Sequence, residues 1–145
     1  MKYERILDLY KDRVDKNGVT YLYHLFDVVL QVSHLGVNAI RVALLHDVVE
    51  DGLMTEQELR GSVDRLVADC VMTLTRREFE RYTDYITRVV DSELYLACVV
   101  KMADLRSNLR ESRQAGVQES QRKRYKKALA RLEESWHGKR ETAGA

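Results

Sequence analysis

Apolar residues recur at intervals of three and four along this chain rather than at every second position. This spacing is typical of α-helices that bury one face. The chain contains no proline and few glycines, so little interrupts the pattern. We therefore predict an all-α fold, a single compact bundle of about seven or eight helices.

Capping residues and glycines mark where the predicted helices begin and end. Thr55 and Glu58 have the spacing of a capping box, and Asn38 and Ser62 are suitable N-caps. We predict helices over residues 3–14, 20–36, 38–51, 55–61, 62–73, 82–91, 93–113 and 119–137. The domain should span 1–137, with a frayed tail at 138–145.

Polar residues interrupt the third predicted helix, which is otherwise apolar around most of its circumference. They are His46, Asp47, Glu50 and Asp51, and they precede Gly52. Buried imidazole and carboxylate groups each cost about 2 kcal/mol or more without partners, so a cation or a dense hydrogen-bond network must compensate. In a helix, His46 pairs with Glu50, and Asp47 with Asp51, at a spacing of four. The acidic residues at the helix end would oppose the helix dipole.

Two further polar residues stand in apolar helical segments and can complete a metal site. They are His24 and Asp104. With His46 and Asp47 they would give two imidazoles and two carboxylates, a donor set that suits Mn(II), Fe(II), Ni(II) or Zn(II) better than Ca(II). The ordinary alternatives are a satisfied core histidine at position 24 and a simple Lys101–Asp104 helix pair.

The overall composition argues for a soluble protein without a general nucleic-acid or membrane surface. The chain carries 24 basic and 23 acidic residues. Its start has no apolar leader, and no apolar run is long enough for a membrane span. We interpret Cys70 and Cys98 as reduced core thiols and the basic segment 121–127 as a solvated helix face. These features predict a cytoplasmic protein, and they leave its oligomeric state open.

Three segments together resemble a known family. They are His24, the sequence HDVVED at 46–51 and the sequence KMADLRSNL at 101–109. The combination resembles the HD-domain metal-dependent phosphohydrolases, in the branch of the RelA/SpoT-homologue (p)ppGpp hydrolases. The segment 74–86 is similar to that of short, stand-alone bacterial members of this branch.

The resemblance implies an HD-domain fold, one bound metal ion, normally manganese, and a nucleotide substrate. It implies removal of the 3′-pyrophosphate of (p)ppGpp by a water molecule that the metal activates. It assigns as metal ligands His24, His46, Asp47 and Asp104. It assigns Glu50 and Asp51, the acid pair, to positioning and activating the water. It implies substrate contacts from Lys16, Tyr21, Asn108, Arg76 and Arg77.

The chain departs from the family pattern at three positions. Asp15 replaces an arginine expected to stack on guanine, Thr20 replaces a proline, and Phe79 stands where glycine is frequent. Two alternatives therefore stay open: a hydrolase of another nucleotide or phosphorylated cofactor, and a non-catalytic nucleotide sensor that keeps the metal site. The acid pair favours an enzyme, because a pure binder does not need a water-activating pair.

Overall fold

The structure is a computed structural model that describes the backbone of residues 1–110 and 117–144 and the side chains of residues 1–110 and 117–136. Its elements are α1 (Tyr3–Tyr10), α2 (Tyr21–Val32), the 3-10 helix η1 (Ser33–Leu35), α3 (Val37–Leu45), α4 (Glu56–Arg60), α5 (Arg65–Leu74), α6 (Tyr82–Asp91), α7 (Tyr95–Asn108) and α9 (Glu119–Gly144). The predicted all-α bundle is confirmed. Within the described ranges, none of these helices has the length and apolar character needed to cross a membrane.

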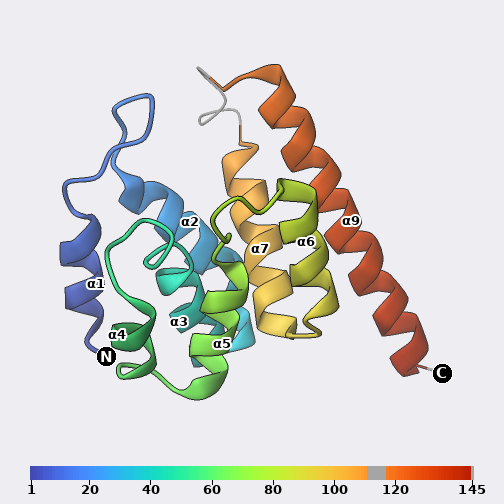
Figure 1. Cartoon of the computed structure of the whole chain (residues 1–145), viewed down its shortest axis with the longest axis horizontal. Helices are drawn as coiled ribbons and strands as arrows, with labels where there is room; N and C mark the ends of the chain where they lie inside the picture. Colours follow the sequence, from blue (N-terminus) through green and yellow to red (C-terminus); the bar gives the residue numbers. More distant parts are fainter. Residues whose placement is uncertain (111–116, 145) are drawn as a thin grey trace.

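Helix α7 lies at the centre of the bundle (Figure 1). It contacts α2, α3 and α5 on one side, and α6 and α9 on the other. Helix α1 packs against α2, and the short α4 packs against α5. The central position of α7 brings its side chains close to those of α2 and of the chain that leaves α3, so polar groups from three distant segments can meet inside the molecule.

Apolar side chains from every α-helix in the described ranges form the core. The largest fully buried ones include Tyr10, Leu25, Leu45, Ile86 and Leu105. Burying an aliphatic side chain of this size contributes about 1.5 to 3 kcal/mol, so this core is the main stabilising feature. Cys70 and Cys98 are buried and neither is part of a disulfide, as predicted for core thiols.

Several helices begin or end away from the predicted residues. Helix α3 follows Gly36 rather than an Asn38 cap, since Gly36 has a φ of 105° that suits glycine. Ser62 does not cap α5: its hydroxyl donates to the Glu58 carbonyl instead. Thr55 does cap α4, by accepting from the Glu58 N–H at 3.1 Å. Helix α7 ends at Asn108, before the predicted end at 113, which itself lies outside the described residues. Helix α9 continues to Gly144, beyond the predicted end at 137.

The prediction that 46–51 continues the third helix is wrong. Helix α3 ends at Leu45, and the chain then forms consecutive turns. The N–H of Val48 donates to the Leu45 carbonyl at 3.0 Å, and the N–H of Asp51 donates to the Asp47 carbonyl at 2.9 Å. Gly52 closes these turns with a φ of 71°. Glu50 and Asp51 therefore do not lie at a helix end. The expected unfavourable interaction of their carboxylates with the helix dipole does not apply.

The loop between α5 and α6 holds a phenylalanine in a backbone conformation that favours glycine. Phe79 has a φ of 62°, and its side chain is 96% exposed. The next residue fixes the loop, because the Glu80 carboxylate pairs with the Arg88 guanidinium at 2.9 Å. The position where the resembled family has glycine is thus one where glycine would fit without strain.

Candidate metal centre

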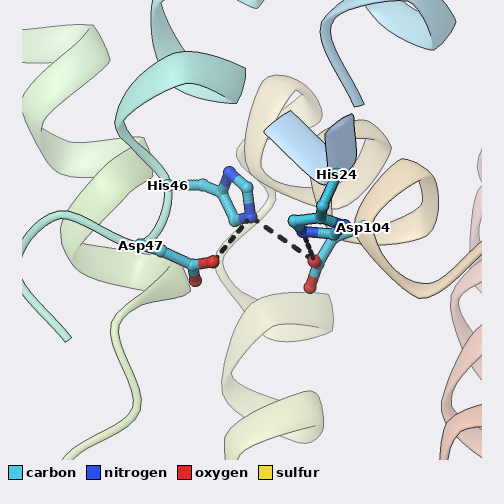
Figure 2. A group of neighbouring side chains, drawn as sticks. All are labelled: His24, His46, Asp47 and Asp104. Carbon is cyan, nitrogen blue, oxygen red and sulfur yellow. Dashed lines mark ion pairs between the residues drawn. The ribbon is translucent and has the colours of Figure 1, made fainter. Parts of the chain in front are cut away.

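Four donor side chains converge between α2, α3 and α7 (Figure 2). His24 comes from α2, and Asp104 comes from α7. His46 and Asp47 come from the turn that directly follows α3. One ligand atom from each residue lies within 4.8 Å of the others. Both histidines and Asp104 are buried. We call these four residues the four-donor centre, and this group could hold a metal ion.

The orientation of His46 fits a cation better than it fits a plain hydrogen-bond network. Its Nδ1 lies 2.6 Å from the Ala43 carbonyl oxygen, which can only accept, so Nδ1 carries the proton. In the neutral ring, the Nε2 lone pair then faces carboxylate oxygens of Asp47 at 3.2 Å and Asp104 at 3.4 Å. Nε2 is buried without a hydrogen-bond partner among the described groups. A metal ion between these atoms would satisfy all three.

Protonation of His46 is the other way to satisfy these atoms. Burial lowers the pKa of His46, but the carboxylates of Asp47 and Asp104 outweigh burial and hold that pKa well above its usual value. In the absence of metal, the imidazolium therefore balances part of the negative charge in the centre.

His24 is oriented by residues that the sequence analysis did not identify. Its Nε2 lies 2.9 Å from Asp104 Oδ1, and its Nδ1 lies 2.8 Å from Ser107 Oγ. Burial would raise the pKa of Asp27, but Arg110 and Ser107 lower it, and Arg110 Nη2 donates to Asp27 Oδ1 at 2.8 Å. Outer partners of this kind fix the ring position and tautomer of metal-binding histidines. The sequence offered one signal for this role, because Ser107 follows Asp104 by three residues and so lies about one helical turn beyond it. In the structure Ser107 is fully buried.

Asp104 has the most polar partners in the centre. In addition to both imidazoles, Lys101 Nζ donates to Asp104 Oδ2 at 2.8 Å and Asn108 Nδ2 donates to Asp104 Oδ1 at 3.3 Å. Burial opposes ionisation of Asp104, but Lys101 and the histidines hold its pKa well below the usual range. The carboxylate is therefore charged. The Lys101–Asp104 pair belongs to the site rather than to a solvated helix surface.

Tyr21 connects the first loop to the centre. Its hydroxyl donates to Asp47 Oδ2, and its ring lies next to His24. Burial would raise the pKa of Asp47, but His46 and this hydrogen bond lower it, so Asp47 is also charged. The sequence analysis predicted that Tyr21 contacts substrate, and this stays a prediction. The structure shows that Tyr21 positions a donor of the centre.

The acid pair lies beside the centre, within electrostatic reach of Asp47. Glu50 Oε1 accepts from the Arg76 N–H at 2.8 Å, and Asp51 lies 3.6 Å from the Arg13 guanidinium. Burial and the Asp47 carboxylate raise the pKa of Asp51 to about 6. Burial likewise raises the pKa of Glu50. A carboxyl group with a pKa near neutrality is suited to accept a proton from water.

Replacing Asp51 with Asn should stabilise the metal-free protein near neutral pH. The pKa of Asp51 is about 6 in the folded protein against 3.8 ordinarily, so the fold favours the protonated carboxyl. The stability that Asp51 contributes is therefore fully present below pH 3.8 and is lost as pH rises through 6. The free energy of unfolding of D51N should exceed that of wild type by about 1 to 3 kcal/mol at pH 7.5. Denaturant unfolding with chelator at several pH values measures the difference, which should shrink towards pH 4. A gain that does not change with pH would contradict this account.

Three predicted substrate contacts line one pocket. They are Lys16, Tyr21 and Asn108, which with Tyr125 line a cavity of 290 Å³. This pocket borders the centre, because Tyr21 hydrogen-bonds to Asp47 and Asn108 hydrogen-bonds to Asp104. Arg77 lies elsewhere, lining a different cavity with Asp84 and Arg88.

Arginine and tyrosine side chains form a second group next to this pocket. Two guanidinium groups lie over the Tyr82 ring. The distance from the guanidinium carbon to the ring centroid is 4.4 Å for Arg124 and 5.6 Å for Arg76. Tyr125, which lines the pocket, has its ring centroid 6.0 Å from that of Tyr82. We call Arg76, Tyr82, Arg124 and Tyr125 the basic–aromatic cluster. Arg124 is exposed, but it is more than part of a solvated face.

The basic–aromatic cluster carries positive charge close to the centre. Among the described residues, neither Arg76 nor Arg124 forms an ion pair with a carboxylate, although the Arg76 Nε donates to the Glu80 carbonyl. Burial raises the pKa of Tyr82, and the charges of Lys101 and Asp104 also influence that pKa. The Tyr82 hydroxyl is buried and has no hydrogen-bond partner among the described residues. Two arginines close to one aromatic ring are suited to binding phosphate.

Neither a protein-family model nor a curated protein matches this chain.

Proposed function

We propose that this protein is a metal-dependent phosphohydrolase of the HD-domain type that acts on a nucleotide. The observation that carries the proposal is the His46 ring: Ala43 fixes its tautomer, and its buried Nε2 faces two charged carboxylates. The donor set of two nitrogens and two oxygens supports Mn(II) first, with Fe(II), Ni(II) and Zn(II) as alternatives. One ion per chain is expected.

The residues around the centre support hydrolysis. A bound divalent ion would polarise a phosphoryl oxygen and make a nearby water more acidic. Asp51, with its raised pKa, would accept the proton from the attacking water, and Glu50 would help to orient that water. Lys101 keeps Asp104 charged, and Tyr21 holds Asp47 in place.

The pocket and the basic–aromatic cluster support a phosphorylated nucleotide as substrate. Lys16, which lines the pocket, and Arg124, which lies over the Tyr125 ring, would neutralise phosphate charge, and Tyr125 offers an aromatic face. By resemblance, our first choice of reaction is removal of the 3′-pyrophosphate of (p)ppGpp. Water attacks the phosphorus attached to the 3′ oxygen, and the bond from that phosphorus to the 3′ oxygen breaks. The 3′ oxygen takes up a proton, and the products are pyrophosphate and GDP or GTP.

The first loop favours keeping a second candidate, hydrolysis of a nucleotide with another base or of a phosphorylated cofactor. Asp15, at the position of the family's arginine, has Oδ1 accepting from the N–H groups of Asn17 at 2.8 Å and Val19 at 3.0 Å. Arg13, the nearest preceding arginine, points to Asp51. Neither residue supplies the cation that would stack on guanine.

A nucleotide panel tests the proposal. Wild-type protein with Mn(II) should release pyrophosphate from ppGpp or pppGpp, or phosphate from a 2′- or 3′-phosphorylated cofactor or a nucleoside monophosphate, and chelator should stop the reaction. Ion chromatography of the products identifies the bond that breaks. Metal-loaded protein that hydrolyses no member of the panel would contradict the proposal, and tight nucleotide binding without turnover would favour a sensor.

A further inference from the structure

Tyr10, the last residue of α1, has a buried hydroxyl without a partner. The side chain is fully buried, and its hydroxyl has no hydrogen-bond partner among the groups that the structure describes. Such groups are rare in folded proteins because they cost free energy. The ring stacks on Tyr21, with centroids 4.7 Å apart. A phenylalanine could make the same stack, so packing does not explain the hydroxyl.

The charged groups that act on this hydroxyl belong to the candidate site. Burial raises the pKa of Tyr10, and the carboxylates of Asp47 and Asp51 raise it further; Arg13 and Glu50 act more weakly. The phenol therefore stays neutral. Tyr21, on which the Tyr10 ring stacks, donates its own hydroxyl to Asp47. The Tyr10 ring thus packs on the residue that holds a donor of the centre, and the Asp47 and Asp51 carboxylates lie within electrostatic reach of its hydroxyl.

We propose that Tyr10 positions the attacking water together with Asp51, an inference that rests on the proposed function. A buried water needs two or more polar partners. The water would donate one hydrogen to the Asp51 carboxylate and the other to the Tyr10 oxygen. Its lone pairs then point away from these two residues, and one of them forms the bond to phosphorus. Asp51 takes the proton, the bond from phosphorus to the leaving oxygen breaks, and that oxygen leaves with a proton from solvent.

Tyr10→Phe and Tyr85→Phe form a matched pair for the test. Tyr85 is also buried, but its hydroxyl donates to the Leu74 carbonyl at 2.6 Å, which is a structural contact. Without metal, Y10F should raise the melting temperature by about 2 to 5 °C and Y85F should lower it, because only Y85F loses a hydrogen bond. Per metal-loaded chain, kcat of Y10F should fall by about 10- to 100-fold with KM and metal content unchanged, whereas Y85F keeps its kcat.

Melting with and without Mn(II) gives a readout other than activity. The rise in melting temperature on adding Mn(II) should be smaller for Y10F than for wild type, because the hydroxyl finds its partner only in the assembled site. Equal rises in both proteins, with an unchanged kcat in Y10F, would overturn the inference while wild-type turnover upholds the proposed function. If metal-loaded wild type hydrolyses nothing, the proposed function fails, and the water-positioning role fails with it.

Discussion

Replacing Asp104 with Asn should remove the metal and with it all hydrolysis above the assay background. Asp104 is the residue on which His24, His46 and Lys101 converge. An amide keeps the shape of the carboxylate but not its charge, so bound metal measured by elemental analysis should fall from about one ion per chain to near none. The free energy of unfolding of the metal-free protein should also fall, by about 3 to 5 kcal/mol, because the buried Lys101 ammonium loses its counter-charge.

The double variant Lys101→Met/Asp104→Asn separates these two effects. Removing both charges should restore most of the lost stability, since no uncompensated ammonium is left in the core. The metal and the activity should stay lost. Denaturant unfolding and elemental analysis of wild type, D104N and the double variant measure both quantities. Full metal content in D104N would show that the ion binds elsewhere.

Replacing the acid pair, as Glu50→Gln/Asp51→Asn, should lower kcat by about 100-fold or more while metal content and KM change little. The amides keep the shape of both side chains but cannot accept a proton. In wild type, the rate should rise with pH through about 6 as Asp51 loses its proton. The residual rate of the variant should not show this rise near pH 6. Steady-state kinetics between pH 5 and 8 test both expectations, at about half-unit intervals.

A matched control for the acid pair is Glu56→Gln/Asp69→Asn, which removes the same charges from exposed ion pairs of Arg60. This control should keep the wild-type rate. If wild type binds a guanine nucleotide tightly but hydrolyses none, and the acid-pair variant behaves identically, the sensor alternative replaces the enzyme.

The helical periodicity predicted every described α-helix because each buries apolar residues, and burial sets that period. It did not predict the 3-10 helix η1, which has no buried residue. It did not predict where α3 ends. Residues 39–49 are apolar enough to continue a helix, but the backbone turns at His46. Local sequence preference cannot show this turn, because the partners of His46 and Asp47 lie on α2 and α7, far away in the chain.

The four donors were predicted as a set, and the structure brings all four together. Polar residues in apolar segments are visible in a sequence because they break its pattern. Lys101 and Tyr10 are harder to assign. A lysine three residues before an aspartate is ordinary on a helix surface, and a tyrosine in an apolar stripe looks like core. Only the packing shows that one neutralises Asp104 and that the other has an unpartnered hydroxyl.

The high pKa of His46 makes metal uptake an exchange rather than an addition. The ring that would bind the ion carries an extra proton in the metal-free protein, held by Asp47 and Asp104. An incoming cation must displace this proton, so metal and acid compete for the same lone pair, and affinity falls as the medium becomes more acidic. The same proton limits repulsion between the carboxylates of Asp47 and Asp104 while no ion is bound.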